Sequence, residues 1–295
     1  MGNIIRASAS CNLLSSQNEP IMLKTNFQTE LIPPAPVKRG HTGADVRRVQ
    51  EWLCLNAPFF PTVALAVKID NDFGPATEQA VKRFQERVQL SPTGVVTPAV
   101  FNRLTRPLSA AFTMAEPQPG QSVRELIVAV AARHRSQFAA ELQTSTRTTN
   151  LGPWVRSYCE GLEGPDILWC MGFAQAILDQ ASSAVGRVFT SLMPRSLSCD
   201  EVARAGQNSG RLLSSPTVRQ NPARVRPGDL FLLRRTVQGK PDWFHTGIIT
   251  AVGDGVFSTV EGNTNQTGSP NGTAVFARVR NFRQQTLDVF SVEDL

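Results

Sequence analysis

The sequence predicts an α+β fold, in which a small three-helix bundle precedes a domain of helices packed on an antiparallel sheet. Between residues 37 and 107, apolar residues recur every three or four positions, which is the spacing of short amphipathic helices. The later part of the chain contains alternating stretches around glycine-rich turns, as in antiparallel strands. With 295 residues and 41% hydrophobic side chains, the chain can bury a sizeable core without disulfide bonds.

Composition also predicts where the domains begin and end. Residues 1–36 are polar and end in a proline-rich stretch, which predicts a disordered or extended leader. Residues 37–107 are the helical bundle, residues 108–120 are a linker rich in Pro and Ala, and residues 121–295 are the second domain. We recognise no signal peptide and no apolar run long enough to span a bilayer, so we expect synthesis in the cytoplasm.

Charge and cysteine content limit the classes of partner. The net charge of +6 is spread along the chain without a basic run, so neither nucleic acid nor a membrane is indicated, whereas an anionic wall polymer would suit it. Five cysteines without a Cys-x-x-Cys pair and three scattered histidines argue against a zinc site. We therefore expect a monomer with no metal and no cofactor.

Each helix of the bundle has its own start signal. Asp45 suits the first turn of the first helix, and Pro75 occupies the first position of the second helix. Thr97 is placed to cap the third helix, immediately before Pro98. The apolar residues that follow each start are expected to face one another and form a shared core.

The bundle resembles the peptidoglycan-binding domain that is attached to many cell-wall hydrolases. The resemblance covers residues 38–106 and rests on Gly43, Val46, Val49, Gln50, Leu53, Asp70, Phe73, Gly74, Thr77, Ala80, Val81, Phe84, Gln85, Gly94, Val95 and Leu104. Most of these residues are expected to build the core and the helix caps. Binding of peptidoglycan is therefore implied by the resemblance rather than by the chemistry of any one residue.

Residues 122–143 predict one long helix, with Leu126, Val130 and Phe138 on its buried side. His134 lies on this helix between two arginines. Because neighbouring cations disfavour a charged imidazole, we expect His134 to be a solvated surface residue.

Cys170 falls at or just before the first turn of another predicted helix. A helix N-terminus carries partial positive charge and unpaired N–H groups, and both favour the thiolate form that attacks carbonyl groups. Free cysteines are more often buried apolar residues than nucleophiles. The nucleophile interpretation of Cys170 therefore needs a base elsewhere in the chain.

His245 is the candidate base, because it opens an alternating stretch after a polar loop predicted at residues 234–244. The stretch continues into a hairpin whose loop is residues 253–255. Depending on the centre of this turn, His245 faces Asn263 or Glu261, and both share its face of the sheet. Either residue could orient the imidazole, which would complete a thiol-hydrolase arrangement.

The order of these motifs resembles the CHAP domain, a papain-like family of cysteine- and histidine-dependent amidohydrolases and peptidases. The resemblance covers about residues 120–295 and rests on Trp169-Cys170, Pro227-Gly228-Asp229, His245, Glu261-Gly262-Asn263 and Arg280. It implies that Cys170 is the nucleophile, His245 the catalytic histidine, and Glu261 and Asn263 the remaining active-site positions. Arg280 matches a late-strand arginine without an assigned role. Gly172 departs from the family pattern together with Met171, and we expect it to let substrate approach the backbone.

Together the resemblances imply a peptidoglycan hydrolase that cleaves a stem-peptide amide or the muramoyl–alanine linkage. Such an enzyme could be a phage lysin or a delivered antibacterial effector, acting in the periplasm or outside the cell, and an immunity or holin partner is left open. The alternatives are a catalytically inactive wall-binding module and an amidase acting on a small amide conjugate. The sequence predicts no role for Cys11, Cys54, Cys159 or Cys199.

Overall fold

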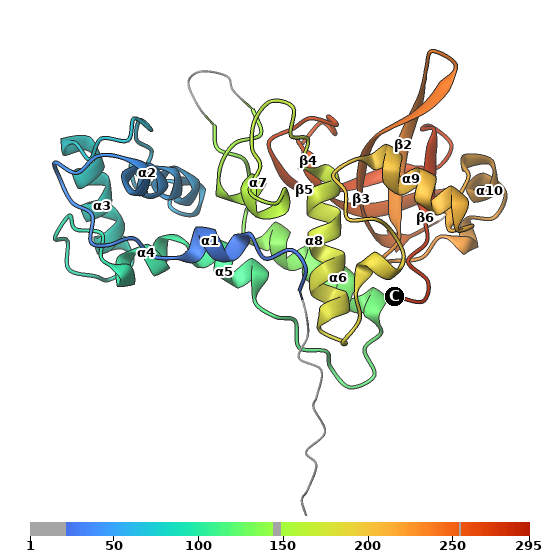
Figure 1. Ribbon diagram of the computed structural model, residues 1–295, viewed down its shortest axis with the longest axis horizontal. Helices are drawn as coiled ribbons and strands as arrows, with labels where there is room; N and C mark the ends of the chain where they lie inside the picture. Colours follow the sequence, from blue (N-terminus) through green and yellow to red (C-terminus); the bar gives the residue numbers. More distant parts are fainter. Residues whose placement is uncertain (1–21, 144–148, 254) are drawn as a thin grey trace, which may run out of the picture.

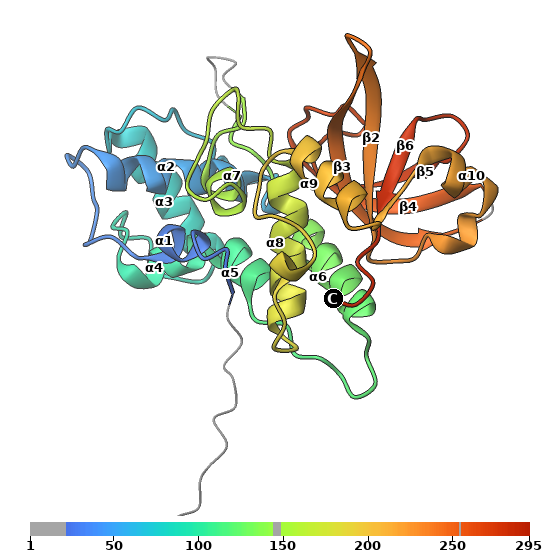
Figure 2. The ribbon, with the colours of Figure 1, turned by 45° about the vertical axis from the view of Figure 1, so that its right-hand side comes forward.

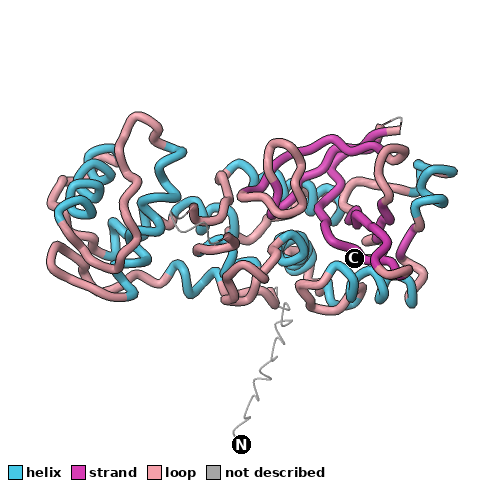
Figure 3. The backbone as a smooth tube through the Cα atoms, turned by 90° about the horizontal axis from the view of Figure 1, so that it is seen from above, coloured by secondary structure: helices cyan, strands magenta, loops and turns pink. Residues whose placement is uncertain are grey.

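The computed structural model describes residues 22–143, 149–253 and 255–295. Residues 1–21 of the predicted leader, including Cys11, lie outside the described residues. The helical bundle occupies one end of an elongated molecule and the sheet occupies the other, with helices between them (Figures 1 and 3).

The bundle consists of α2 (Ala44–Asn56), α3 (Pro75–Arg87) and α4 (Pro98–Leu104), with a 3₁₀ turn η1 (Ala57–Phe59) after α2. The helices begin where the start signals predict. The Thr97 side chain accepts a hydrogen bond from the Val100 N–H, and prolines occupy the first positions of α3 and α4. Leu53, Phe84 and Phe101 are buried at its centre. The predicted three-helix bundle is therefore confirmed.

Two buried glutamines fix the turns of the bundle. Gln50 accepts hydrogen bonds from the backbone of Asp70 and Asn71, and Gln85 accepts one from Gly94 N–H at 2.9 Å. The same two amides also donate, Gln50 to the carboxylate of Asp70 at 2.9 Å and Gln85 to a main-chain carbonyl at 2.9 Å. Because buried amides need partners for both ends, these glutamines lock the turns that precede α3 and α4.

Helices also form in the predicted leader and linker. In the leader, residues Phe27–Leu31 form α1, and the Phe27 ring stacks on Phe112 with centroids 4.4 Å apart. Phe112 ends α5 (Arg106–Phe112), which follows α4 and covers part of the predicted linker. Apolar burial against the rest of the chain explains why both segments are ordered, although their composition is that of connectors.

Helix α6 (Val123–Ser136) begins with a capping box between Ser122 and Glu125, but it is shorter than predicted. It ends where Phe138 adopts a left-handed backbone conformation (φ 52°). The Phe138 side chain is 58% exposed, so its predicted place in the core is wrong. The apolar spacing continued past the point at which the backbone leaves the helix.

The prediction of a solvated His134 is also wrong. The ring is fully buried, with Nδ1 2.9 Å from the Tyr158 hydroxyl and Nε2 2.7 Å from the Gln180 amide. Burial lowers the pKa of His134 to about 3, so the imidazole is neutral. Successive helical residues point about 100° apart, so the neighbouring arginines can reach solvent while His134 faces the core.

The sheet is antiparallel, with strand order β1-β6-β2-β3-β4-β5. Its strands are β1 (Leu212–Leu213), β2 (Leu230–Val237), β3 (Lys240–Val252), β4 (Val256–Thr264), β5 (Ala274–Asn281) and β6 (Leu287–Phe290). The predicted hairpin is confirmed as β3 and β4, in which Ile248 pairs with Val260. Ile248 and Ile249 follow the register that would set His245 opposite Asn263, but the pairing shifts between Ile249 and Ala251, and His245 and Asn263 are not themselves a pair.

The polar stretch at residues 234–244 is not a loop, contrary to the prediction. It continues β2 and β3 into a second hairpin, in which Val237 pairs with Lys240. Gln238 and Gly239 form its turn, both with positive φ (50° and 77°). A two-residue turn of this kind matches the twist of the flanking strands. The hairpin projects beyond the rest of the sheet (Figure 2).

The remaining helices are α7 (Pro153–Tyr158), α8 (Cys170–Ser183), α9 (Cys199–Asn208) and α10 (Ser215–Gln220), with the 3₁₀ turns η2 (Phe189–Ser191) and η3 (Pro222–Arg224). Every residue of α8 is buried, and this helix contacts α6, β3 and β4. The α+β class is therefore confirmed. Within the described ranges, no helix combines the length and apolar character needed to cross a membrane.

Candidate active site

Cys170 is the first residue of α8 and lies beside a pocket. The pocket has a volume of about 360 Å³, and its lining includes Leu168, Cys170, Leu197, Cys199, Trp243 and Phe244. Trp169 precedes the helix, and its ring stacks on that of Tyr158 with centroids 5.7 Å apart. This stacking fixes the chain just before the thiol, so that the start of α8 meets the pocket in one orientation.

On the sheet, His245, Glu261 and Arg280 form a buried chain of contacts across three neighbouring strands. His245 Nε2 lies 2.9 Å from Glu261 Oε2. Arg280 donates from Nε to Glu261 Oε1 at 2.7 Å, and its second nitrogen donates to Oε2. The Thr259 hydroxyl also donates to Oε1. The carboxylate of Glu261 is therefore held from both sides and keeps the imidazole in one orientation.

The absence of a side chain at Gly247 leaves space for the Glu261 side chain. A Cβ atom at Gly247 would lie 2.7 Å from Glu261 Cγ and 3.0 Å from the Phe231 ring. The Phe231 ring in turn packs 5.9 Å from the His245 ring centroid and lies 4.8 Å below the Arg280 guanidinium carbon. The glycine that follows His245 by two positions is therefore a packing requirement of the carboxylate.

Burial and these neighbours set the charges. Burial opposes ionisation of His245, but Cys170 and Glu261 outweigh it and raise the pKa of His245 to about 9. Burial likewise opposes the charge on Glu261, yet His245 and Arg280 lower the pKa of Glu261 to about 2. The Cys199 thiol has the largest effect on Cys170; together with His245 and the Thr246 main-chain amide it lowers the pKa of Cys170 well below the ordinary value, against burial.

These directions favour a thiolate at Cys170 and an imidazolium at His245. His245 uses Nε2 for Glu261, while its buried Nδ1 has no hydrogen-bond partner among the described residues. Nδ1 is therefore the ring atom left available for proton exchange with the thiol. The arrangement combines a charged sulfur, a proton donor and a carboxylate that holds the donor.

Among the described residues, Asn263 makes no hydrogen bond to His245. Its backbone is left-handed (φ 53°), which interrupts the strand alternation on which the shared-face prediction depended. In the amide orientation that satisfies both ends, its oxygen accepts from Trp169 N–H at 3.3 Å and its nitrogen donates to Gly272 O at 2.7 Å. Asn263 therefore supports the backbone next to Cys170, and Glu261 is the residue that contacts the imidazole.

Gly172 has a packing role that differs from the predicted substrate approach. A Cβ at this position would lie 2.8 Å from the Tyr158 carbonyl oxygen and 2.9 Å from Cys159 Sγ. A Cβ at Gly262 would likewise lie 2.6 Å from Cβ of Phe173 on α8. The two glycines let α8 sit close to α7 on one side and to β4 on the other.

Sequence reasoning missed Cys199 and did not assign a role to Arg280. Cys199 follows the Ser198 cap of α9, which marks a helix start but gives no sign of which residues it meets. The contact of Arg280 with Glu261 depends on the pairing of β4 with β5, which no local signal predicts. Within the described ranges, no group of three or more His, Cys, Asp or Glu side chains is gathered to hold a metal ion.

Comparison with known proteins associates the chain with the cell wall. Residues 42–104 match the family described as "Putative peptidoglycan binding domain", in agreement with the resemblance predicted for the bundle. The "Zinc D-Ala-D-Ala carboxypeptidase" of Streptomyces albus G is 35% identical over 68 residues, which are 23% of this chain and 25% of that protein. The chain thus spans about a quarter of the length of that relative. The matched family leaves residues 105–295 uncovered, so the CHAP resemblance there depends on the residues and their geometry.

Proposed function

We propose that the protein hydrolyses an amide bond in the peptide part of peptidoglycan by a cysteine-dependent mechanism. Two observations support the proposal: Cys170 begins α8, where His245 is among the groups that lower the pKa of its thiol, and Glu261 and Arg280 hold the imidazole of His245. The match of residues 42–104 supports peptidoglycan as the polymer. The named activity of the carboxypeptidase relative also supports action on a peptide bond of the wall, although that enzyme is named for zinc.

In the proposed reaction, the Cys170 thiolate attacks the amide carbonyl carbon and a tetrahedral oxyanion forms. His245, as imidazolium, then gives its proton to the leaving amine, and a thioester to Cys170 remains. Neutral His245 next takes a proton from water, and the resulting hydroxide attacks the thioester. Release of the acid returns the thiolate and the imidazolium, so each turnover consumes one water.

The main-chain N–H groups in the first turn of α8 would stabilise the oxyanion by donating hydrogen bonds to it. These N–H groups have no acceptor within the helix, and the helix N-terminus is electropositive. The main-chain N–H of Cys170 itself is the donor nearest the reacting carbon by connectivity. Loss of one such donor in other hydrolases costs about 10²- to 10³-fold in rate.

The bundle would act by keeping the cleft near an insoluble polymer. Once residues 42–104 are attached to the wall, the encounter of the cleft with a bond becomes intramolecular. A weak affinity is sufficient for this effect, because the gain comes from local concentration.

The second candidate function is an inactive wall-binding module. The buried contact between His245 and Glu261, with Nδ1 of His245 unpaired among the described residues, favours an active hydrolase over this module. Burying charged groups lowers stability, so a module that only binds would gain nothing from them. An amidase for small conjugates has the same chemistry, and the bundle favours the polymer over it.

The test compares wild type with Cys170→Ala on purified sacculi, following turbidity and the masses of released fragments. We expect wild type to release peptides and Cys170→Ala to release none while still sedimenting with sacculi. Cys54→Ser is the matched control, because this thiol lies in the bundle and bonds to Val67. Equal release by wild type and Cys170→Ala would rule out the mechanism, and digestion of soluble conjugates alone would favour the amidase.

A further inference from the structure

A second thiol, Cys199, faces the same pocket as Cys170. Cys170 begins α8 and Cys199 begins α9, and both line the pocket of about 360 Å³. Both are free thiols, with 2% and 6% of their surface exposed. The amide hydrolysis described above does not use Cys199, so its place beside the nucleophile is unexplained by that reaction.

The two thiols line one pocket and shift each other's pKa in opposite directions. Cys199 lowers the pKa of Cys170, whereas Cys170 raises the pKa of Cys199 well above the ordinary value. The reduced pair therefore holds one thiolate and one thiol. A reactive thiolate next to a second thiol is the arrangement of an oxidisable cysteine and its resolving cysteine.

The other described cysteines lack this arrangement. Cys159 is buried beneath α8, and burial raises its pKa to about 12. Cys54 lies in the bundle, where it bonds to Val67 and burial raises its pKa. Neither lines the pocket, so the two provide matched controls for thiol chemistry.

We propose that Cys199 is a resolving thiol, which forms a reversible disulfide with Cys170 when the protein meets a peroxide. The disulfide occupies the nucleophile and protects it from irreversible oxidation. The formation of the bond needs only the two thiols and the oxidant. Its consequence, reversible loss of amide hydrolysis, rests on the proposed function.

The chemistry requires two steps. In the first, the Cys170 thiolate attacks one oxygen of hydrogen peroxide, the S–O bond forms and the O–O bond breaks; the leaving hydroxide takes the His245 proton and becomes water. The sulfur is oxidised to a sulfenic acid and the peroxide is reduced. In the second, the Cys199 sulfur attacks the Cys170 sulfur, and the S–O bond breaks as the hydroxyl leaves with the Cys199 proton as water. One peroxide thus yields one disulfide and two waters.

The test treats the full chain with several molar equivalents of hydrogen peroxide, blocks free thiols with N-ethylmaleimide, and maps the peptides by mass spectrometry. We expect wild type to lose two hydrogen atoms and to give a peptide cross-linked between Cys170 and Cys199, which dithiothreitol separates. Cys199→Ala should give no cross-link and should gain two oxygen atoms at Cys170, which dithiothreitol does not remove. Cys159→Ala should cross-link as wild type does.

Absence of the cross-link in wild type, or the same oxidation products in wild type and Cys199→Ala, would overturn the proposal. Thermal melting of Cys199→Ala and Cys199→Ser checks that both variants fold. Because mass is the readout, the pair can be tested even if the protein fails to digest sacculi. Where digestion occurs, peroxide should reduce it to background and dithiothreitol should restore it in wild type, but not in Cys199→Ala.

Discussion

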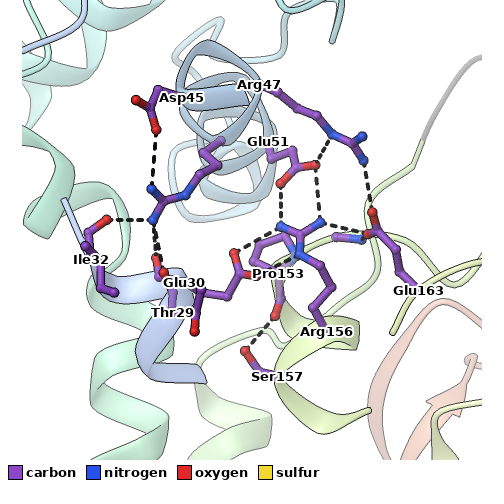
Figure 4. Close-up of polar contacts among 12 residues, drawn as sticks. Thr29, Glu30, Ile32, Asp45, Arg47, Glu51, Pro153, Arg156, Ser157 and Glu163 are labelled. Atoms are coloured by element: carbon purple, nitrogen blue, oxygen red, sulfur yellow. Dashed lines mark hydrogen bonds and ion pairs between the residues drawn. The ribbon is translucent and has the colours of Figure 1, made fainter. Parts of the chain in front are cut away.

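Arg156 and Arg280 each hold buried carboxylates, one at the junction of the bundle with α7 and the other on the sheet. Arg156 contacts three carboxylates, those of Glu30 on α1, Glu51 on α2, and Glu163 after α7, at 2.7 to 2.8 Å (Figure 4). Arg47 adds a second guanidinium, which bonds to Glu51 and Glu163. Within the described ranges, this junction cluster consists of arginines and glutamates and includes no histidine.

The cluster on the sheet has the same arginine–carboxylate contact but includes a histidine. The pKa of His245 is raised to about 9, so its charge changes around that pH, and its Nδ1 has no hydrogen-bond partner among the described residues. In the junction cluster, by contrast, the guanidinium of Arg156 uses all three nitrogens. The nitrogens of Arg156 are all hydrogen-bonded and hold chain segments together. Nδ1 of His245 has no hydrogen-bond partner among the described residues and is available for proton transfer.

Substitution of Glu261 by Gln gives the largest expected effect. The amide can no longer stabilise the imidazolium, and it leaves Arg280 without its ion pair. We expect the rate of release from sacculi to fall by about 10²- to 10⁴-fold, as when the orienting carboxylate of a triad is replaced. Circular dichroism must show a folded variant, and an unchanged rate would remove Glu261 from the mechanism.

The pH dependence of alkylation tests the charges of Cys170 and of the His245 cluster on the sheet. Because the pKa of Cys170 is lowered, iodoacetate should modify it well below the ordinary thiol pKa of about 8.5, where Cys54, whose pKa is raised, stays unreactive. Above about pH 9 the rate with this anion should fall, since His245 loses its positive charge. Peptide mapping identifies the modified thiol.

A single rise near the ordinary thiol pKa of about 8.5 would contradict the ion pair. Neutral iodoacetamide is the control reagent, because its rate should not fall when the imidazolium is lost.

Arg156→Met tests the junction cluster. The change leaves Glu30 and Glu51 without their main partner, and an unpaired buried charge costs about 3 kcal/mol or more. We expect urea unfolding to report this loss, while the alkylation rate of Cys170 stays at the wild-type value. Arg47→Met is the matched control, because its side chain is 41% exposed and exposed pairs contribute about 1 kcal/mol or less. Equal effects of the two variants would contradict the importance of Arg156.

Thr259→Val has the smallest expected effect. It removes one hydrogen bond to Glu261 but keeps those from Arg280. The loss should be about 1 kcal/mol in unfolding free energy. The pKa of His245, measured by NMR titration, should rise slightly, because a carboxylate that has lost a donor stabilises the imidazolium more strongly. A His245 titration that stays at its wild-type position would mean that the Thr259 bond does not support the carboxylate.

Local signals in the sequence predicted the parts of the fold that depend on neighbouring residues. Thr97 and the prolines marked helix starts, and residues 253–255 marked the β3–β4 hairpin, because caps and tight turns are set within a few positions. The placement of Cys170 at a helix start followed from the same kind of signal.

Features set by distant partners could not be predicted in this way. His134 is buried because α6 turns it toward Tyr158 and Gln180, and flanking residues cannot reveal that direction. Glu261 and Asn263 could be separated only by the left-handed backbone at Asn263. The meeting of Cys199 with Cys170 depends on how two helix starts pack, which no spacing in the chain records.

The attachment of the first described residues has a consequence for synthesis on the ribosome. The main-chain N–H groups of Leu23 and Lys24 donate to the Asp179 carboxylate, 156 and 155 positions later in the chain. At translation rates of about 5 to 20 residues per second, Leu23 and Lys24 wait roughly 8 to 30 s for this acceptor to be made. The bundle can fold from local contacts during that interval. Residues 22–31 therefore attach to α8 only after the bundle has been synthesised.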